Sequence, residues 1–153
     1  MCIIIDANAA HEIGSAPIHP DARPVLRWLS SKRGTLALGG RLTDELYRTP
    51  LKRLLVELTR AGAAKLYQAS LIHETERRVH ATGACISNDL HILALALVSG
   101  ARLLYSRDQA LHADFRHPEI INSPRGHIYS SLDHQHLLWN AVCGRQPPRR
   151  DGY

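Results

Sequence analysis

Acidic residues stand at the ends of the most apolar segments of this chain, where they could form a metal site. Four apolar runs each lie beside one acid, and these acids are Asp6, Glu45, Asp89 and Asp108. In a protein of alternating strands and helices, the carboxyl ends of the strands lie along one edge of the sheet, where ligands bind. Carboxylates gathered there repel one another unless a proton or a cation joins them. The pattern therefore predicts a site for a hard divalent cation with oxygen ligands.

Each acid also has a purely structural interpretation. An ionised Asp6 directly after three isoleucines is costly unless it is paired or bound to metal, but an Asp at a strand end can also cap a turn. Asn8, two residues on, could orient a ligand or a water from the same strand end. Asp89 falls in the first turn of an expected helix, where the helix dipole favours an acid, and Asp108 could be an ordinary N-cap. The metal site rests on the set of acids and not on one member.

Glu45 is preferred over its neighbour Asp44 because of helical spacing. Leu42 and Leu46 define the buried face of the expected helix, and Glu45 borders that face. Asp44 lies about 100° away around the helix and nearer to solvent. Glu45 is therefore the expected site residue.

The apolar pattern predicts an α/β protein in which a parallel sheet is flanked by helices. Strands are expected where short apolar runs are bounded by turn residues, at 2–5, 35–38, 65–69, 102–105 and 120–121. Helices are expected at 21–34, 42–58 with a break at Pro50, 71–80, 88–98 and 109–115, with Asp21 and Ser87 as N-caps of the first and the fourth.

Composition limits the class of protein. The 153 residues, 44% of them hydrophobic, fit one globular domain, expected over 1–143, with a disordered tail at 144–153. No apolar stretch approaches the roughly 20 residues of a membrane span, and no signal peptide is recognised. Three widely spaced cysteines predict free thiols in a reducing cytoplasm. The net charge of +5 permits a polyanionic partner without requiring one.

Three segments together resemble the PIN-domain family. They are Ile3-Ile4-Ile5-Asp6-Ala7-Asn8, the run from Ser87 to Ala96, and the run from Leu103 through Asp108 to Phe115, with the helix that carries Glu45 between the first two. The resemblance covers about residues 2–121 and rests on ordered spacing. It implies a three-layer α/β/α sandwich with a parallel central sheet and a ribonuclease site that depends on Mg²⁺ or Mn²⁺.

The resemblance also implies roles for individual residues. Asp6, Glu45, Asp89 and Asp108 fall on the acidic positions of the family. Ser106 falls where a hydroxyl residue usually supports the site, and Asp114 is either an accessory acid or a helix-end charge. A lone domain of this size further resembles toxins of bacterial toxin–antitoxin pairs, which implies a homodimer and a small inhibitory protein partner.

The expected function is therefore that of a cytoplasmic, metal-dependent endoribonuclease that hydrolyses phosphodiester bonds of single-stranded or looped RNA. A basic rim around the pocket is expected to bind flanking phosphates, from Arg48, Lys52, Arg53 and Arg107. The main alternative is an inactive PIN-like module that binds RNA or a protein. A zinc site of His127, His134, His136 and Cys143 is disfavoured because its spacing matches no standard ligand pattern.

Overall fold

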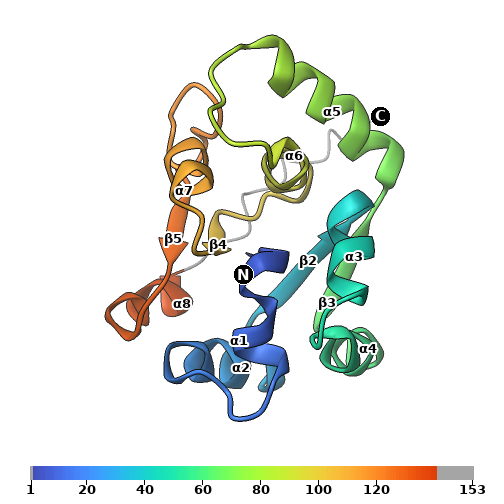
Figure 1. Cartoon of the computed structure of the whole chain (residues 1–153), viewed down its shortest axis with the longest axis vertical. Coiled ribbons are helices and arrows are strands. Elements are labelled where there is room, and N and C mark those ends of the chain that lie inside the picture. The colour runs from blue at the N-terminus through green and yellow to red at the C-terminus, as the bar shows by residue number, and fades with distance from the viewer. Residues whose placement is uncertain (1, 141–153) are drawn as a thin grey trace, which may run out of the picture.

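A parallel sheet of five strands forms the centre of the computed structural model, which describes residues 2–140 (Figure 1). The strand order is β3-β2-β1-β4-β5, and every neighbouring pair is parallel. The strands are β1 (Cys2–Ile5), β2 (Thr35–Gly39), β3 (Ala64–Tyr67), β4 (Leu103–Tyr105) and β5 (His127–Tyr129). The predicted α/β class with a parallel sheet is confirmed.

Helices connect the strands and complete the α/β/α arrangement. Those between β1 and β3 are α1 (Ala10–Gly14), α2 (Arg23–Ser30), α3 (Gly40–Tyr47) and α4 (Lys52–Arg60), with the short 3-10 helices η1 (Ala7–Ala9) and η2 (Pro20–Ala22). Those after β3 are α5 (Ala69–Ala81), α6 (Leu90–Ser99), α7 (Gln109–Phe115), η3 (Leu132–His134) and α8 (His136–Asn140).

The sheet reverses its direction of growth beside β1. The chain first builds β1, β2 and β3 toward one edge, then crosses back to place β4 and β5 on the other side of β1. Because such crossovers are right-handed, the connections on the two sides lie on opposite faces of the sheet. The point between β1 and β4 is where the carboxyl ends of the strands open a crevice for ligands in folds of this type.

The apolar residues of β1 and α6 form the centre of the core. All four residues of β1 are buried, which suits a short β-branched run in a parallel sheet. Residues 91–96 of α6 are all buried, because this helix is apolar on nearly every side and packs against α5, β2 and β3. Gly100 ends the helix in the left-handed conformation, at φ 76°.

One predicted strand is wrong. Ile120 and Ile121 are buried, as a strand would require, but their backbone N–H groups both donate to the carbonyl of His117, at 3.0 and 2.9 Å. They therefore form a turn that packs onto the core. The fifth strand is β5 instead, a three-residue segment that begins with the exposed His127 and carries too short a pattern to be recognised.

Both predicted helix caps are also wrong. His19 caps η2, since its Nδ1 accepts from the backbone N–H of Asp21 at 3.1 Å. Asp89 occupies the N-cap position of α6 without a side-chain cap, and the hydroxyl of Ser87 is buried with no hydrogen-bond partner. The carboxylate of Asp21 instead accepts hydrogen bonds from Arg107 and from the backbone N–H of Leu132.

The cysteines differ from the expectation of free thiols. Cys2 is disulfide-bonded, whereas Cys85 is a free thiol whose pKa is raised by burial. Cys143 and the expected tail at 144–153 lie outside the described residues. Among residues 2–140, no helix has the length and apolar character needed to cross a membrane.

Candidate metal centre

Four acids from four separate elements lie near one another at the carboxyl ends of β1 and β4. Asp6 follows β1, and Asp108 follows the adjacent strand β4. Burial raises the pKa of Asp6, and the charges of Asp108 and Glu45 raise it further. The pKa of Asp89 is likewise raised by burial and then by Asp6, although His91 opposes the shift. Because the charges of Asp108 and Glu45 act on both Asp6 and Asp89, the four carboxylates form one acidic cluster.

Asp6 is the most buried member, with 2% of its surface exposed. Its Oδ2 accepts a hydrogen bond from the Ser106 hydroxyl at 2.8 Å, and its Oδ1 accepts from the backbone N–H of Asn8 at 3.3 Å. Both interpretations of the sequence therefore apply, because Asp6 caps the turn of η1 and also belongs to the acidic cluster. Asn8 contributes its backbone, while its own side chain is exposed.

Ser106 joins Asp6 to Asp108. Its hydroxyl donates to Asp6 and accepts from the backbone N–H of Asp108 at 3.1 Å. One oxygen of Asp108, Oδ1, accepts from the backbone N–H groups of Ala110 and Leu111 at 2.9 and 3.2 Å and so caps α7. A buried serine between two strand ends thus fixes the orientation of two acids.

Asp114 holds the loop that presents Asp89. The buried carboxylate of Asp114 accepts from the backbone N–H of Ile86 at 3.0 Å and from that of Ser87 at 2.8 Å. Asp89 follows two residues later, at the start of α6. The resemblance implied that Asp114 is either an accessory acid or a helix-end charge. The hydrogen bonds show a further role, in which Asp114 anchors this loop and so positions Asp89.

Glu45 borders the cluster and contacts a histidine that the sequence did not single out. Glu45 is 29% exposed, and its Oε1 accepts from Arg41 Nε at 2.9 Å. Its Oε2 lies 3.3 Å from Nε2 of His91, which is 2% exposed. The place of His91 in the helix turn after Asp89 is the signal that could have marked it as part of the site.

We expect Glu45→Gln to reduce RNA cleavage at least about tenfold, a loss of about 1.4 kcal/mol of transition-state stabilisation. Asp44→Asn should leave the rate within about threefold, because Asp44 is exposed and lines a cavity beside α5 that includes His91 but none of the four carboxylates. Steady-state turnover of a fluorescent RNA compares the two variants. An inactive Asp44→Asn beside an active Glu45→Gln would mean that the wrong face of α3 had been assigned to the site.

The donor set fits a hard divalent cation. The four clustered side chains offer only carboxylate oxygens, which Mg²⁺ and Mn²⁺ prefer over nitrogen or sulfur. Among residues 2–140, no group of three or more His, Cys, Asp or Glu side chains is arranged so that it could hold a metal ion by itself. An open arrangement of one or two direct carboxylates completed by water is common for Mg²⁺. The zinc alternative gains no support, since His134 Nδ1 accepts from the backbone of Ser130 at 3.0 Å.

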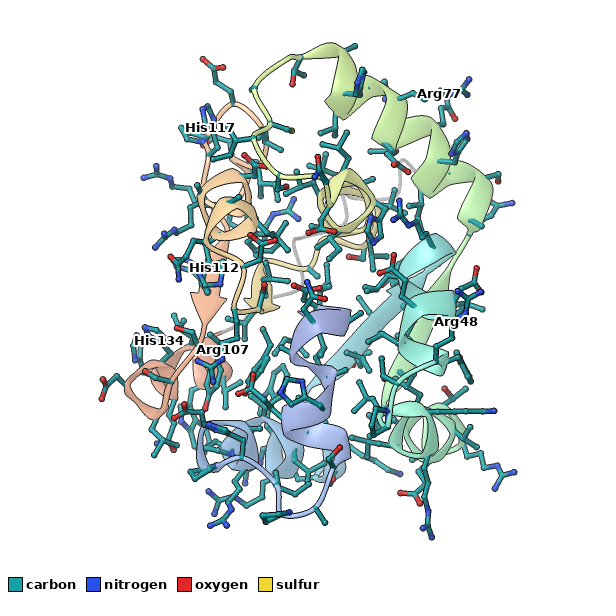
Figure 2. All side chains as sticks on the ribbon, in the orientation of Figure 1. Arg48, Arg77, Arg107, His112, His117 and His134 are labelled. Atoms are coloured by element: carbon teal, nitrogen blue, oxygen red, sulfur yellow. The ribbon has the colours of Figure 1, made fainter. Side chains whose placement is uncertain are left out.

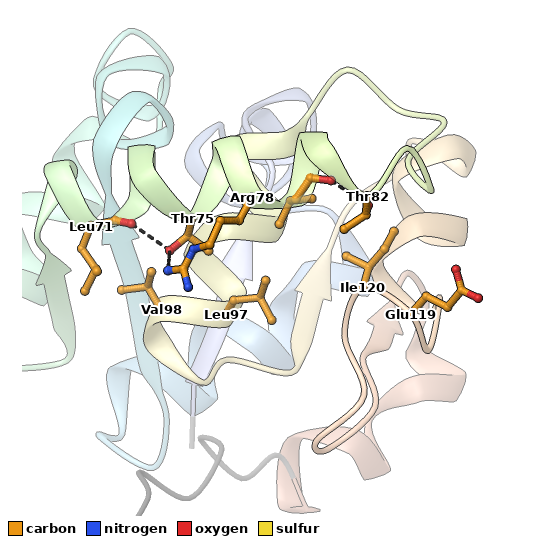
Figure 3. Close-up of a pocket in the computed structure, with 9 residues that line it drawn as sticks. Leu71, Thr75, Arg78, Thr82, Leu97, Val98, Glu119 and Ile120 are labelled. Atoms are coloured by element: carbon orange, nitrogen blue, oxygen red, sulfur yellow. Dashed lines mark hydrogen bonds between the residues drawn. The ribbon is translucent and has the colours of Figure 1, made fainter.

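A mostly apolar cavity between α5 and α6 is separate from the cluster. It measures about 460 Å³ and is lined by side chains that include Leu71, Val79 and Leu97 (Figure 3). Its one arginine, Arg78, donates from Nη2 to the hydroxyl of Thr75 at 3.3 Å. None of the four carboxylates lines this cavity, and Glu119 is the one acid among its described lining residues.

The expected basic rim divides into two groups. Arg48, Lys52 and Arg53 are exposed, and Figure 2 shows Arg48 near α3. Arg53 lies 3.6 Å from Glu57 in a surface ion pair. Their contact with RNA remains a prediction. Arg107 is 39% exposed, and its guanidinium is held by Glu12, which accepts from Nη2 at 2.6 Å and from Nε at 3.0 Å. The first role of Arg107 is therefore structural.

No protein-family model, curated protein or solved structure matches this chain. The resemblance to the PIN-domain family therefore stays a prediction from the sequence. The same holds for the cytoplasmic location, the homodimer and the small inhibitory partner that were expected. The function has to be argued from the chemistry of the site.

Proposed function

We propose that the protein is a metal-dependent ribonuclease that hydrolyses phosphodiester bonds at the crevice between β1 and β4. One observation carries the proposal: Asp6, Glu45, Asp89 and Asp108 come from four elements far apart in sequence, yet at the carboxyl edge of the sheet the charges of Glu45 and Asp108 add to burial in raising the pKa values of Asp6 and Asp89. Crowding of carboxylates costs folding free energy unless a cation neutralises it. A core that served only stability would not need this arrangement.

Residues of the chain supply the geometry for this chemistry. Ser106 and the backbone of Asn8 hold both oxygens of Asp6, and the caps of α7 fix one oxygen of Asp108. Asp89 and Glu45 approach from the helices on the other side. A bound Mg²⁺ or Mn²⁺ ion would activate a water and neutralise the charge that develops on the scissile phosphate. The acids would thus orient the cation and the water in front of the phosphate.

RNA is the proposed substrate because the acids form a local negative site on a chain of net charge +5. A cationic surface attracts a polyanion, and a cation in the acidic cluster allows one phosphate to approach. A single strand or loop can bend its backbone into a crevice at a sheet edge more readily than a duplex. Cleavage of DNA but not RNA by the purified protein would correct the substrate while retaining the mechanism.

Stabilisation by metal tests the site directly. Mg²⁺ or Mn²⁺ at ten times its dissociation constant should stabilise the protein by about 1.4 kcal/mol. For a chain of this size that corresponds to a melting temperature about 3–6 °C higher. Asp6→Asn should remove most of the increment, since it deletes the most buried charge of the cluster. Differential scanning calorimetry at several metal concentrations measures both effects.

The metal-free proteins provide the control for this experiment. Burial and neighbouring charges raise the pKa of Asp6 in the folded state, so the ionised form costs folding free energy at neutral pH. Asp6→Asn without metal should therefore be no less stable than the wild type. An equal metal-dependent increment in wild type and variant would show that the cation binds elsewhere.

A further inference from the structure

A basic cavity lies beside the acidic cluster, between α7, β5 and η3. It measures about 490 Å³, and none of the described residues that line it is acidic. Four histidines and two arginines line it, namely His112, His127, His134, His136, Arg107 and Arg116. Figure 2 shows His112, Arg107 and His134 gathered on this side of the molecule, away from Arg77 on α5. A hollow with this lining is suited to an anion.

The histidine tautomers can be assigned from their hydrogen bonds. His134 Nδ1 accepts from the backbone N–H of Ser130 at 3.0 Å, so the hydrogen of the neutral ring is on Nε2. That N–H is a donor that the ring can offer to a ligand in the cavity. His112 Nε2 donates to the carbonyl of Ser106 at 2.6 Å, which fixes the buried ring in place. The wall of the cavity is therefore built by specific contacts.

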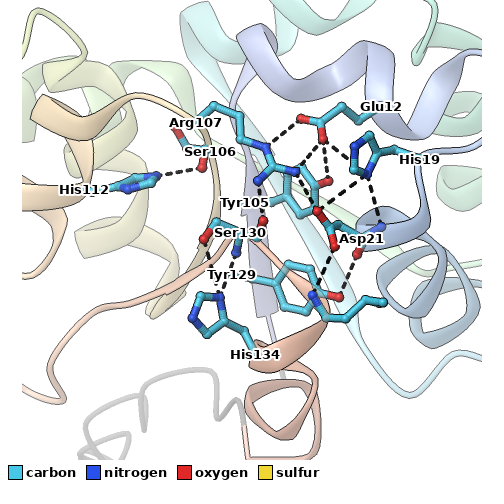
Figure 4. A network of polar contacts seen from close by, with 11 residues as sticks. Glu12, His19, Asp21, Tyr105, Ser106, Arg107, His112, Tyr129, Ser130 and His134 are labelled. Carbon is cyan, nitrogen blue, oxygen red and sulfur yellow. Dashed lines mark hydrogen bonds and ion pairs between the residues drawn. The ribbon is translucent and has the colours of Figure 1, made fainter.

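Arg107 separates the cavity from the acids that balance its charge. Glu12 and Asp21 lie on one side of its guanidinium, whereas His112 and His134 lie on the other (Figure 4). Because Glu12 and Asp21 compensate Arg107, the uncompensated positive charge at the cavity comes chiefly from the exposed Arg116. The histidines add donors without adding negative charge.

The cavity and the acidic cluster are joined through Ser106 and α7. The hydroxyl of Ser106 donates a hydrogen bond to Asp6, and its backbone carbonyl accepts one from His112. One residue therefore contacts the acidic cluster through its side chain and the cavity through its backbone. Asp108 is the N-cap residue of α7, His112 lies four residues later within the helix, and Arg116 is the C-cap residue. The cavity therefore begins one helical turn from a carboxylate of the cluster.

We propose that this cavity binds a phosphate group of the RNA, next to the phosphate that is cleaved at the acidic cluster. The proposal rests on the ribonuclease function proposed above and names a substrate subsite for it. The two sites differ in what they need: the acids require a cation before a phosphate can approach, whereas the cavity can receive a phosphate without metal. A phosphate held there would fix the register of the RNA at the crevice.

Binding of uridine 5′-monophosphate in metal-free buffer tests the cavity apart from any cleavage. The test variant is Arg116→Gln/His127→Gln, because both side chains are exposed and line the cavity. Its matched control is Arg77→Gln/His80→Gln, which makes the same changes on the exposed surface of α5. Calorimetric or NMR titration should show affinity at least about tenfold weaker in the test variant, equal to about 1.4 kcal/mol, and unchanged in the control.

Cleavage of two RNAs then identifies the source of the phosphate. The RNAs have the same sequence and carry either a 5′-phosphate or a 5′-hydroxyl. A preference for the phosphorylated RNA that is lost in the test variant assigns the cavity to a terminal phosphate. A KM raised equally for both RNAs in the test variant assigns it to an internal phosphodiester, and either result supports the proposal.

Two outcomes would overturn it, and they are distinguishable. If the nucleotide fails to bind the wild type, or binds the test variant equally well, the cavity is not a phosphate site, whatever the protein cleaves. If the nucleotide binds at the cavity but the wild type cleaves no RNA with Mg²⁺ or Mn²⁺, the proposed function fails, and the assignment of this phosphate to a substrate RNA fails with it.

Discussion

Replacing Asp89 by Asn is expected to reduce RNA cleavage at least about a hundredfold, a loss of about 2.7 kcal/mol of transition-state stabilisation. Asp89 is half-buried at the start of α6 and does not cap its helix, and burial and the charges of the three other acids raise its pKa. Asn keeps the shape of the side chain but lacks the charge that a cation needs. Single-turnover cleavage with Mg²⁺ or Mn²⁺ measures the effect.

RNA binding by the Asp89→Asn protein is the internal control. We expect its affinity in the presence of EDTA to stay within about threefold of wild type, because the change removes a negative charge and no contact to phosphate. Burial and the neighbouring carboxylates raise the pKa of Asp89, so the metal-free variant should melt no lower than wild type. Near-wild-type cleavage by a folded Asp89→Asn protein would falsify the assignment of this residue.

Arg107→Ala is expected to lower the free energy of unfolding by about 2–3 kcal/mol. Arg107 joins Glu12, Asp21 and the backbone carbonyl of Ser130, and so ties α1, η2 and the end of β5 to β4. Its loss would leave the buried carboxylate of Glu12 without its charged partner. The estimate is below that for a fully buried pair because Arg107 is 39% exposed. Urea denaturation measures the difference.

The matched control is Arg48→Ala. Arg48 is exposed at the end of α3, and we expect its removal to change the free energy of unfolding by less than about 0.5 kcal/mol. For Arg107→Ala the melting temperature should fall by about 4–12 °C. Equal stabilities of the two variants would show that the Arg107 network contributes little to the fold.

The pH dependence of the Arg107 effect has a defined sign. Burial would raise the pKa of Glu12, but the hydrogen bonds and charge of Arg107 outweigh it, and the pKa is lowered. A lowered pKa contributes stability above the unfolded value, about 4.3, which is lost as pH falls through the folded value. The difference between wild type and Arg107→Ala should therefore be full at pH 7 and shrink below about pH 4.

Much of the candidate site could be predicted from the sequence because each acid lies next to the apolar segment that positions it. A β-branched run followed by Asp6 specifies a buried strand with an acid at its end, and the structure has β1 there. The spacing of Leu42 and Leu46 placed Glu45, and not Asp44, at the border of the buried face. Parallel topology then followed from the alternation of strands and helices.

The contacts that join these parts were decided only by the tertiary structure. Ser106 bonds Asp6 across 100 residues, Arg107 bonds Glu12 across 95, and His91 meets Glu45 across 46. Periodicity shows which side of an element is buried, but it does not show which distant side chain will face it. That depends on the strand order, in which β1 lies between β2 and β4.

The same reason explains what the sequence missed. Ile120 and Ile121 are as apolar as a strand requires, but they are buried in a turn. The fifth strand, β5, forms instead from a segment with a shorter apolar pattern, which pairs with β4. The basic cavity is lined by residues of α7, of β5 and of the segment after β5. No spacing of residues in the sequence predicts this cavity. The sequence by itself was enough to predict the class of fold and to select the four acids as a candidate site. Packing of the whole chain decided which residues meet, because long-range pairing depends on the fit of all elements around one core.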